Sequence, residues 1–271
     1  MNDLFSLFGK TALITGGSGV LGFAMARHLA RAGANIALLA RDESKLTQKV
    51  SALRAEGATV AGFAASVGSK EELVAARKAV HEKLGPVHIL VNSAGGNMPG
   101  ATIGPDQNFF DLDIEAYQKV VDLNLTGSVL PSLVFGADMA AKKQGCIINI
   151  SSMTAAQPIS RVMGYGNSKA AIDNFTKWLS TELISKYGEG IRVNAIAPGF
   201  FLTEQNRSLL TNPDGSYTDR GKAILANTPM KRFGDPDELG GTVVWLCSNA
   251  SKFVTGIVVP VDGGFSAFGG L

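Results

Sequence analysis

Short apolar segments that predict β-strands alternate with amphipathic segments that predict α-helices along almost the whole chain. Helical periodicity is clearest in residues 21–32, 43–56, 70–84 and 235–248. Such alternation is typical of a doubly wound α/β fold, in which helices cover both faces of a mostly parallel sheet. We therefore predict one seven-stranded sheet and a single domain over residues 1–271. The predicted strands are residues 11–15, 35–40, 59–64, 88–92, 146–150, 192–196 and 257–261.

A glycine-rich turn between the first strand and the first helix predicts a ligand. Gly17, Gly19 and Gly22 have the spacing G-x-G-x-x-G. Glycines here let the backbone approach a pyrophosphate group, which the N-terminus of the helix then favours. The pattern alone could mark a tight turn, but its strand–turn–helix context favours dinucleotide binding in a Rossmann-type fold. The predicted contacts in the turn come from Gly16, Gly17, Ser18, Gly19, Val20 and Leu21.

The end of the second predicted strand bears on the choice of cofactor. An acidic residue there would bind the ribose 2′-hydroxyl of NAD, whereas an arginine can accommodate the 2′-phosphate of NADP. Ala40 stands where the acid is expected, and Arg41 follows it. Asp42 could serve NAD, but it also fits the acidic first turn of the next helix. We therefore expect NADP as the preferred cofactor and NAD as the alternative.

A candidate catalytic group surrounds the fifth predicted strand. Ser152 closes that strand, at the edge of a parallel sheet where ligands bind. Tyr165 and Lys169 are four residues apart in a predicted helix and therefore share one of its faces. A free tyrosine titrates near ~10, and we expect the lysine cation to lower this pKa, which makes the hydroxyl a usable acid or base. A tyrosine and a lysine on an ordinary exposed face are the alternative interpretation.

Composition and simple sequence features argue against several classes of protein. The formal net charge of +2 gives no reason to expect binding to nucleic acid or to a membrane surface. The N-terminal residues do not resemble a signal peptide, and no apolar run approaches the roughly 18 residues that span a bilayer. The three histidines lack metal-ligand spacing, so we expect no metal. With its two cysteines in apolar runs, the chain is predicted to be cytoplasmic.

Further motifs accompany the candidate catalytic group. They are the turn at 15–22, the run Asn92-Ser-Ala-Gly95, Asn124, Ser152 thirteen residues before Tyr165, Lys169, and the run from Pro198 to Thr203. Together they resemble the short-chain dehydrogenase/reductase family over nearly the whole chain. The resemblance implies NAD(P)-dependent hydride transfer to or from a small polar carbonyl or alcohol.

The family resemblance also implies roles for four residues. Tyr165 would be the acid/base, and Ser152 would hold the substrate oxygen. Lys169 would bind the nicotinamide ribose and lower the pKa of Tyr165. Asn124 would hold a water molecule of a proton relay.

The same resemblance implies further cofactor contacts and shows two departures from the family pattern. The implied contacts are Asn92, Ala94, Gly95, Pro198, Gly199, Phe201 and Thr203, with Tyr165 and Lys169. The family commonly places its middle glycine where this chain has Val20, while Gly19 lies one residue earlier. After the third strand, Ser66 and Val67 replace the family's Asp-Val pair. We expect a weaker adenine contact from the serine.

A narrower resemblance concerns the substrate. The runs 94–101, 110–113, 196–207 and 260–267 are similar to the D-mannonate oxidoreductase (fructuronate reductase) branch of the family. That branch implies reduction of D-fructuronate to D-mannonate. The alternatives are another keto acid or acyl substrate, such as a gluconate-type sugar acid or a 3-oxoacyl thioester, and a non-catalytic nucleotide-binding module.

Two long segments interrupt the regular alternation, and one of them predicts a substrate lid. Residues 96–113 and 203–234 read as loops, and loops of this length in a compact domain are usually functional. A substrate carboxylate suits an arginine, whose fork matches it. The predicted substrate contacts are Asn97, Ser152, Met153, Arg161 and Arg207. The apolar C-terminal tail, residues 254–271, predicts an interface, and relatives resembling this chain are commonly tetramers, so we expect a homotetramer.

Overall fold

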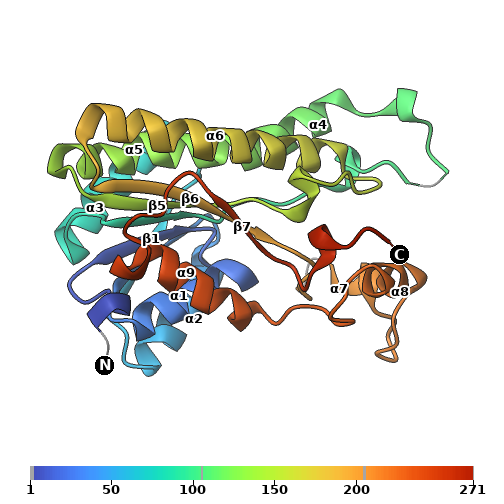
Figure 1. Ribbon diagram of the computed structural model, residues 1–271, viewed down its shortest axis with the longest axis horizontal. Helices are drawn as coiled ribbons and strands as arrows, with labels where there is room; N and C mark the ends of the chain where they lie inside the picture. The colour runs from blue at the N-terminus through green and yellow to red at the C-terminus, as the bar shows by residue number, and fades with distance from the viewer. Residues whose placement is uncertain (1–2, 105, 204–205, 271) are drawn as a thin grey trace.

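The computed structural model describes residues 3–104, 106–203 and 206–270. Seven strands form one sheet in the order β3-β2-β1-β4-β5-β6-β7 (Figure 1), and all six pairings between them are parallel. The strand order reverses between β1 and β4, and ligands bind at such a switch point, beyond the carboxyl ends of the strands. The strands are β1 (Thr11–Thr15), β2 (Asn35–Ala40), β3 (Val60–Ala64), β4 (Ile89–Asn92), β5 (Gly145–Ile150), β6 (Ile191–Pro198) and β7 (Val258–Val261).

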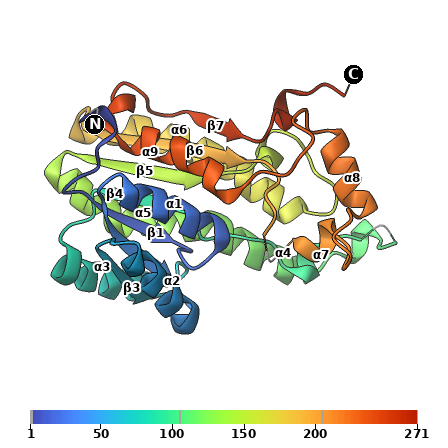
Figure 2. The same ribbon diagram turned by 90° about the horizontal axis from the view of Figure 1, so that it is seen from below.

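Helices cover both faces of the sheet, as the alternation predicted (Figures 1 and 2). One face carries α1 (Val20–Arg31), α2 (Glu43–Ala55) and α9 (Gly240–Cys247), and the other carries α3 (Lys70–Leu84), α5 (Gly127–Lys142) and α6 (Met163–Tyr187). Successive side chains of a strand point to opposite faces. Ile14 of β1 therefore packs in the first core, whereas the adjacent Leu13 packs in the second.

Polar side chains fix where the helices on either side of β3 begin. Asp42 is the N-cap of α2 and accepts a hydrogen bond from the Lys45 backbone N–H at 3.0 Å. Ser69 is the N-cap of α3 and accepts one from the Glu72 N–H at 3.2 Å. Each cap satisfies an amide group that has no partner inside its own helix. These helices therefore begin where the sequence predicted.

One long helical segment contains a change of helix type. It runs through α4 (Ile114–Val121), a π-helical stretch (Asp122–Thr126) and α5. By length and composition the segment Ile114–Lys142 passes the test for a helix that could cross a membrane, because an 18-residue window within it has a mean hydropathy of 1.4. This finding differs from the expectation that no apolar run of the chain approaches the length of a membrane span. Half of that apolar window is buried inside the fold, and core helices of globular domains pass the same test.

The segment 203–234 is more structured than the predicted loop. Its described residues, which exclude 204 and 205, contain α7 (Arg207–Leu210), α8 (Asp219–Ala226) and a bridge between Thr211 and Tyr217. Leu210, Ile224 and Phe233 form a small apolar core of its own. The segment follows the carboxyl end of β6, and α7 and α8 lie at that end of the sheet in Figure 1.

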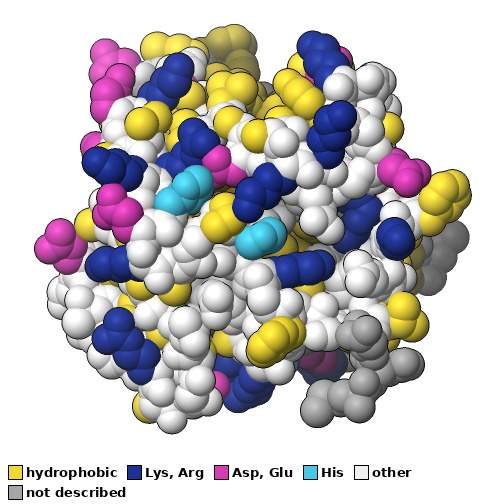
Figure 3. All heavy atoms as spheres, turned by 90° about the vertical axis from the view of Figure 1, so that its left-hand side faces the viewer, with side chains coloured by type: hydrophobic (Ala, Val, Ile, Leu, Met, Phe, Trp, Pro, Cys, Tyr) yellow, Lys and Arg dark blue, Asp and Glu magenta, His cyan; other side chains and the backbone are white. Residues whose placement is uncertain are grey.

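The opposite end of the molecule carries charges of both signs. Figure 3 shows basic and acidic side chains interspersed over this face, without a large area of one sign. Figure 1 places this face at the left, where β5 begins and α6 ends. The charged face therefore lies far from the carboxyl ends of the strands.

Candidate active site

Four predicted residues come together at the carboxyl end of β5. Ser152 follows β5, Tyr165 and Lys169 lie on α6, and Asn124 lies in the π-helical stretch. The Lys169 Nζ is 5.3 Å from the centre of the Tyr165 ring. A Cβ placed on Gly95 would lie 2.6 Å from Asn124 Oδ1 and 3.4 Å from Lys169 Nζ, so the turn after β4 touches both. We call these four residues, Asn124, Ser152, Tyr165 and Lys169, the tetrad.

The hydroxyl group of Ser152 is held from two sides. Ser152 is the N-cap of a 3₁₀ turn, Met153–Ala155, and its Oγ accepts a hydrogen bond from the Thr154 N–H at 3.2 Å. The same oxygen lies 3.5 Å from Met153 Sδ. Both side chains are buried, so the predicted substrate contact Met153 forms a wall beside the Ser152 hydroxyl.

Asn124 is a fully buried residue whose amide group is largely committed to the protein. Its Nδ2 donates to the Gly96 carbonyl at 2.7 Å and to the Val120 carbonyl at 2.8 Å, and its Oδ1 accepts from the Gly96 N–H at 3.1 Å. Both amide hydrogens are thus used, which leaves one oxygen lone pair for a water molecule. Asn124 therefore ties the turn after β4 to the π-helical stretch, a helix type that is frequent at functional sites.

Burial controls the ionisation of the Tyr165–Lys169 pair. It lowers the pKa of the Lys169 ammonium from 10.5 to about 8, although the Asp173 carboxylate opposes this shift. It raises the pKa of the Tyr165 hydroxyl above its usual value, while the Ser152 hydroxyl acts in the opposite direction. The prediction that Lys169 lowers the pKa of Tyr165 is therefore wrong for this arrangement. The physical reason is that burial disfavours the phenolate, while the Lys169 ammonium donates to the Ile150 carbonyl at 2.7 Å.

The side chain of Asn92 lies in a buried polar network beneath the tetrad. Its Nδ2 donates to Ser132 Oγ and to Asn149 Oδ1, both at 2.9 Å, and Asn149 in turn donates to Thr176 Oγ1 at 2.9 Å. The network joins β4, α5, β5 and α6. Asn92 was predicted to line the cofactor, but its side chain serves this network.

At two positions, Gly16 and Gly22, the turn after β1 and the start of α1 have room for glycine only. Gly16 has φ +63°, and a Cβ there would lie 2.8 Å from the Ala94 Cα. A Cβ on Gly22 would lie 2.7 Å from the Gly16 carbonyl oxygen. Gly19 is the N-cap of α1 and has no side chain to accept from the first amide groups of the helix. Backbone N–H groups at the start of a helix can bind a pyrophosphate, so this contact stays a prediction for the turn.

Arg41 and Asp42 have different surroundings at the end of β2. The Asp42 carboxylate caps α2, as the alternative interpretation of the sequence proposed. Arg41 is exposed, beside the glycine turn of the neighbouring strand β1. On the other side of β2, Ser66 Oγ accepts from the Gly68 N–H at 3.3 Å, and Val67 is buried in the core.

The run after β6 is held by close backbone contacts. A Cβ on Gly199, which follows Pro198, would lie 2.6 Å from the Asp262 Cα, so the two chain segments touch. Phe201 is buried and forms a bridge with Gly234. The Thr203 N–H donates to Asn206 Oδ1 at 2.8 Å. These contacts fix both ends of the 203–234 segment.

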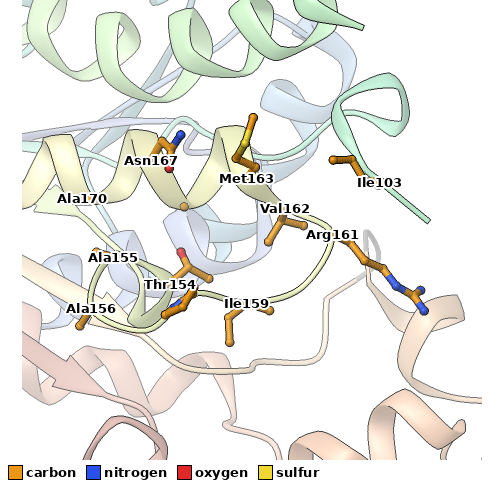
Figure 4. Close-up of a pocket in the computed structure, with 12 residues that line it drawn as sticks. Ile103, Thr154, Ala155, Ala156, Ile159, Arg161, Val162, Met163, Asn167 and Ala170 are labelled. Atoms are coloured by element: carbon orange, nitrogen blue, oxygen red, sulfur yellow. The ribbon is translucent and has the colours of Figure 1, made fainter. Parts of the chain in front are cut away.

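A cavity of about 340 Å³ lies behind the loop that leads into α6. Its α6 wall consists of Met163, Gly166, Asn167 and Ala170, which is a different helix face from that of Tyr165 and Lys169. Arg161 stands at its rim and extends outward, toward α7 and α8 in Figure 4. Arg161 has φ +78°, uncommon for a residue with a side chain.

The other predicted substrate contacts are exposed. Asn97 donates to Thr102 Oγ1 at 2.9 Å, so its amide is engaged locally. Arg207 begins α7, and its side chain is exposed. The structure therefore brings the tetrad together but leaves Asn97 and Arg207 on the surface around it.

Comparisons with known proteins place this site in a family. Residues 18–266 match a family model described as enoyl-(acyl carrier protein) reductase. The chain is 46% identical to the uncharacterized oxidoreductase UxuB of Bacillus subtilis, over 98% of both proteins.

Two solved structures are similar over 98% of both chains. One is a candidate D-mannonate oxidoreductase of Haemophilus influenzae with bound NAD, 42% identical with a TM-score of 0.91. The other is a gluconate 5-dehydrogenase of Burkholderia cenocepacia with NADP and tartrate, 32% identical with a TM-score of 0.85. The chain belongs to the short-chain dehydrogenase/reductase family.

Sequence reasoning missed two residues of this dehydrogenase/reductase that lie near the site. Thr154 is buried beside Ser152, lines the cavity, and its Oγ1 has no hydrogen-bond partner among the described residues. Arg220, on α8, is partly buried, and its pKa is lowered first by burial and then by the charge of Arg161. The hydroxyl directly after the Ser152–Met153 pair could have indicated Thr154. No local pattern indicates Arg220, because its neighbour is distant in sequence.

Proposed function

We propose that this enzyme transfers a hydride between a nicotinamide cofactor and a keto sugar acid, with D-fructuronate and D-mannonate as the expected pair. The observation that carries the proposal is the tetrad at the switch point of the sheet, beside the uncapped glycine turn of α1. Arg161, Arg207 and Arg220 lie on the loop before α6 and on α7 and α8, and arginines suit a substrate with a carboxylate.

Each tetrad residue would have its own role in the reaction. Tyr165 would donate a proton to the substrate carbonyl oxygen, or accept one from the alcohol in the reverse direction. Ser152 would hold that oxygen by a hydrogen bond. The Lys169 ammonium, 5.3 Å from the centre of the tyrosine ring, would bind the nicotinamide ribose. Asn124 would hold a relay water with its remaining lone pair and would position Gly95 and Gly96.

The cofactor would lie along the carboxyl ends of the strands. NAD or NADP supplies the hydride acceptor or donor. The turn from Gly16 to Leu21 would bind the pyrophosphate, and Ser66 and Val67 would contact the adenine. The turn Asn92–Gly95 and the run Pro198–Thr203 would line the nicotinamide side, with Phe201 contributing its backbone. Arg41 supports NADP because Asp42 is engaged as a helix cap, whereas the 42% identical Haemophilus structure contains NAD.

The substrate assignment has two supports and one close competitor. Similarity to the candidate D-mannonate oxidoreductase extends over the whole chain. Similarity to the gluconate 5-dehydrogenase has the same coverage at lower identity, so a gluconate-type sugar acid is the second candidate. A 3-oxoacyl thioester is a third candidate, but its acyl group has no carboxylate that these arginines could bind.

A substrate panel tests this proposal. Purified enzyme is mixed with D-fructuronate, 5-keto-D-gluconate, a 3-oxoacyl thioester and a neutral ketose, each with NADH and with NADPH. Oxidation of the cofactor is followed by its absorbance. We expect the highest kcat/KM for D-fructuronate. Reduction of the thioester alone would overturn the sugar-acid assignment, and no turnover of any substrate would favour a non-catalytic nucleotide-binding module.

We also propose that 203–234 is a substrate lid and that the enzyme is a cytoplasmic homotetramer. Both cysteines are buried free thiols, which suits a reducing compartment. The tail after Val254 leaves apolar surface uncovered: β7 is only partly buried, and Phe253 beside it is fully exposed. Light scattering at micromolar concentration is expected to give four times the 28.3 kDa chain mass, and a monomer mass would contradict the tetramer.

A further inference from the structure

The arginines of this protein fall into two groups. Six have protein partners: Arg27, Arg31, Arg77 and Arg232 pair with carboxylates, and Arg54 and Arg192 donate to oxygen atoms. For the other four, the described part of the chain provides no ion pair and no side-chain hydrogen bond. One of them, Arg41, lies at the expected cofactor site. The remaining three are Arg161, at the rim of the cavity beside α6, Arg207, at the start of α7, and Arg220, on α8.

Two of these three arginines come from distant segments, and the side chain of one, Arg161, points toward the segment that carries the other, Arg220. Arg161 precedes α6, and Arg220 lies in the first turn of α8. The charge of Arg161 lowers the pKa of Arg220, which burial already lowers. The backbone at Arg161 is pinned, because its carbonyl accepts from the Ile103 N–H at 3.1 Å. Figure 4 shows the Arg161 side chain directed toward the helices of the 203–234 segment.

Two neighbouring guanidinium groups repel each other, and partial burial increases the cost of their charges. The carboxylate nearest to Arg220 in sequence does not relieve this cost. Asp219 is fully exposed and pairs with Lys222 at 3.5 Å. A ligand carboxylate between the two arginines would remove the repulsion, and the planar fork of each guanidinium matches a carboxylate.

We infer that Arg220 is a specificity-determining residue that, together with Arg161, clamps the carboxylate of the substrate. The inference rests on the proposed function, because it assigns the acid end of the proposed keto sugar acid to this pair. One arginine belongs to the loop before the catalytic helix and the other to the proposed lid. The substrate carboxylate therefore links the lid to the catalytic loop. Because a neutral sugar cannot make this link, the enzyme selects acids.

The test compares Arg220→Met, Arg161→Met and the double variant with wild-type enzyme. Lys222→Met is the matched control, since it removes a cation from the same helix that pairs with Asp219. KM and kcat are measured for D-fructuronate and for a neutral ketose, and protection by tartrate against thermal unfolding is measured without turnover. We expect each arginine variant to raise the KM for D-fructuronate roughly 10- to 100-fold. We expect tartrate protection to be lost and the neutral ketose to be little affected.

The double variant should be scarcely worse than the worse single variant, because both arginines hold one group. Arg220→Lys, which keeps the charge, should show a smaller loss and guards against misfolding of the methionine variant. Equal effects of Arg220→Met on the acid and the neutral ketose, or none on either, would overturn the clamp. If wild-type enzyme reduces no sugar acid, the proposed function fails, and tartrate protection lost in Arg220→Met but kept in Lys222→Met still supports the clamp.

Discussion

The tetrad and the 203–234 segment, our proposed substrate lid, are built in opposite ways. Asn124, Ser152 and Lys169 are buried, and the side chains of Asn124 and Lys169 donate hydrogen bonds to carbonyl groups of residues distant in sequence. In the 203–234 segment, most polar side chains are exposed and bond within a few residues, as Asp214 does with Ser216 at 2.7 Å. A buried hydrogen-bond network restricts its side chains to one geometry. A segment whose hydrogen bonds are mostly local can open as a unit, because few of its bonds to the rest of the fold must break.

This difference suggests that the two regions have different functions in the enzyme. Proton chemistry needs donors and acceptors fixed within hydrogen-bond reach, and the sheet and α6 provide that rigidity. Selection of a substrate needs groups that close around it, and those groups can lie on a segment of low local stability. The two parts should therefore respond differently to substitution.

Removal of the Tyr165 hydroxyl should have the largest effect. Tyr165→Phe keeps the ring packed against its neighbours but removes the proposed proton donor, so turnover should fall at least ~100-fold. Cofactor binding, measured by fluorescence titration, should stay nearly unchanged. Turnover close to that of the wild type would show that another group carries the proton.

Truncation of side chains in two apolar cores should show that the two regions differ in their contribution to stability. Ile147→Ala in β5 removes a fully buried side chain from the core between the sheet and α3, α5 and α6. It should lower the free energy of unfolding by about 2–5 kcal/mol. Leu210→Ala loosens the small core of the 203–234 segment. Because that segment can open locally, the global free energy should fall by less than about 1 kcal/mol, while the KM for substrate rises. Denaturant titration and steady-state kinetics measure both, and equal losses of stability would show that the segment is part of the rigid core.

The buried ammonium of Lys169 should make stability depend on pH. Its folded pKa of about 8 lies below the ordinary 10.5, so between these values the unfolded chain binds more protons. Wild-type stability should therefore rise with pH across this window, relative to Lys169→Met. The gain should reach about 3 kcal/mol, measured by denaturant titration at several pH values. A difference that does not vary with pH would contradict burial of a charged amine in the rigid region.

The smallest expected effect concerns the exposed Arg41. If it binds the 2′-phosphate of NADP, Arg41→Ala should raise the KM for NADPH several-fold, because an exposed, solvated ion pair is weak. The KM for NADH should change little. Equal changes for both cofactors, or a wild-type preference for NADH, would refute the NADP assignment.

The sheet and its helices were predictable because their signals are local. Buried parallel strands are apolar runs, and caps such as Ser69 mark helix starts, so β1, β2 and α3 have the predicted bounds. Short helices that depend on tertiary packing gave no such signal, and α7 and α8 were predicted as loop. The Lys169–Ile150 hydrogen bond and the Arg161–Arg220 pair join residues far apart in sequence. Spacing along the chain could therefore suggest the tetrad but not its ionisation.

The central claim is that this short-chain dehydrogenase/reductase reduces a keto sugar acid through Tyr165. The most direct test is the initial rate of D-fructuronate reduction by wild-type enzyme and by Tyr165→Phe, with NADH and NADPH in turn. We expect rapid oxidation of at least one cofactor by the wild type and a loss of at least ~100-fold in the variant. Absence of D-fructuronate reduction by the wild type with both cofactors, alongside turnover of a neutral ketose or a thioester, would contradict it.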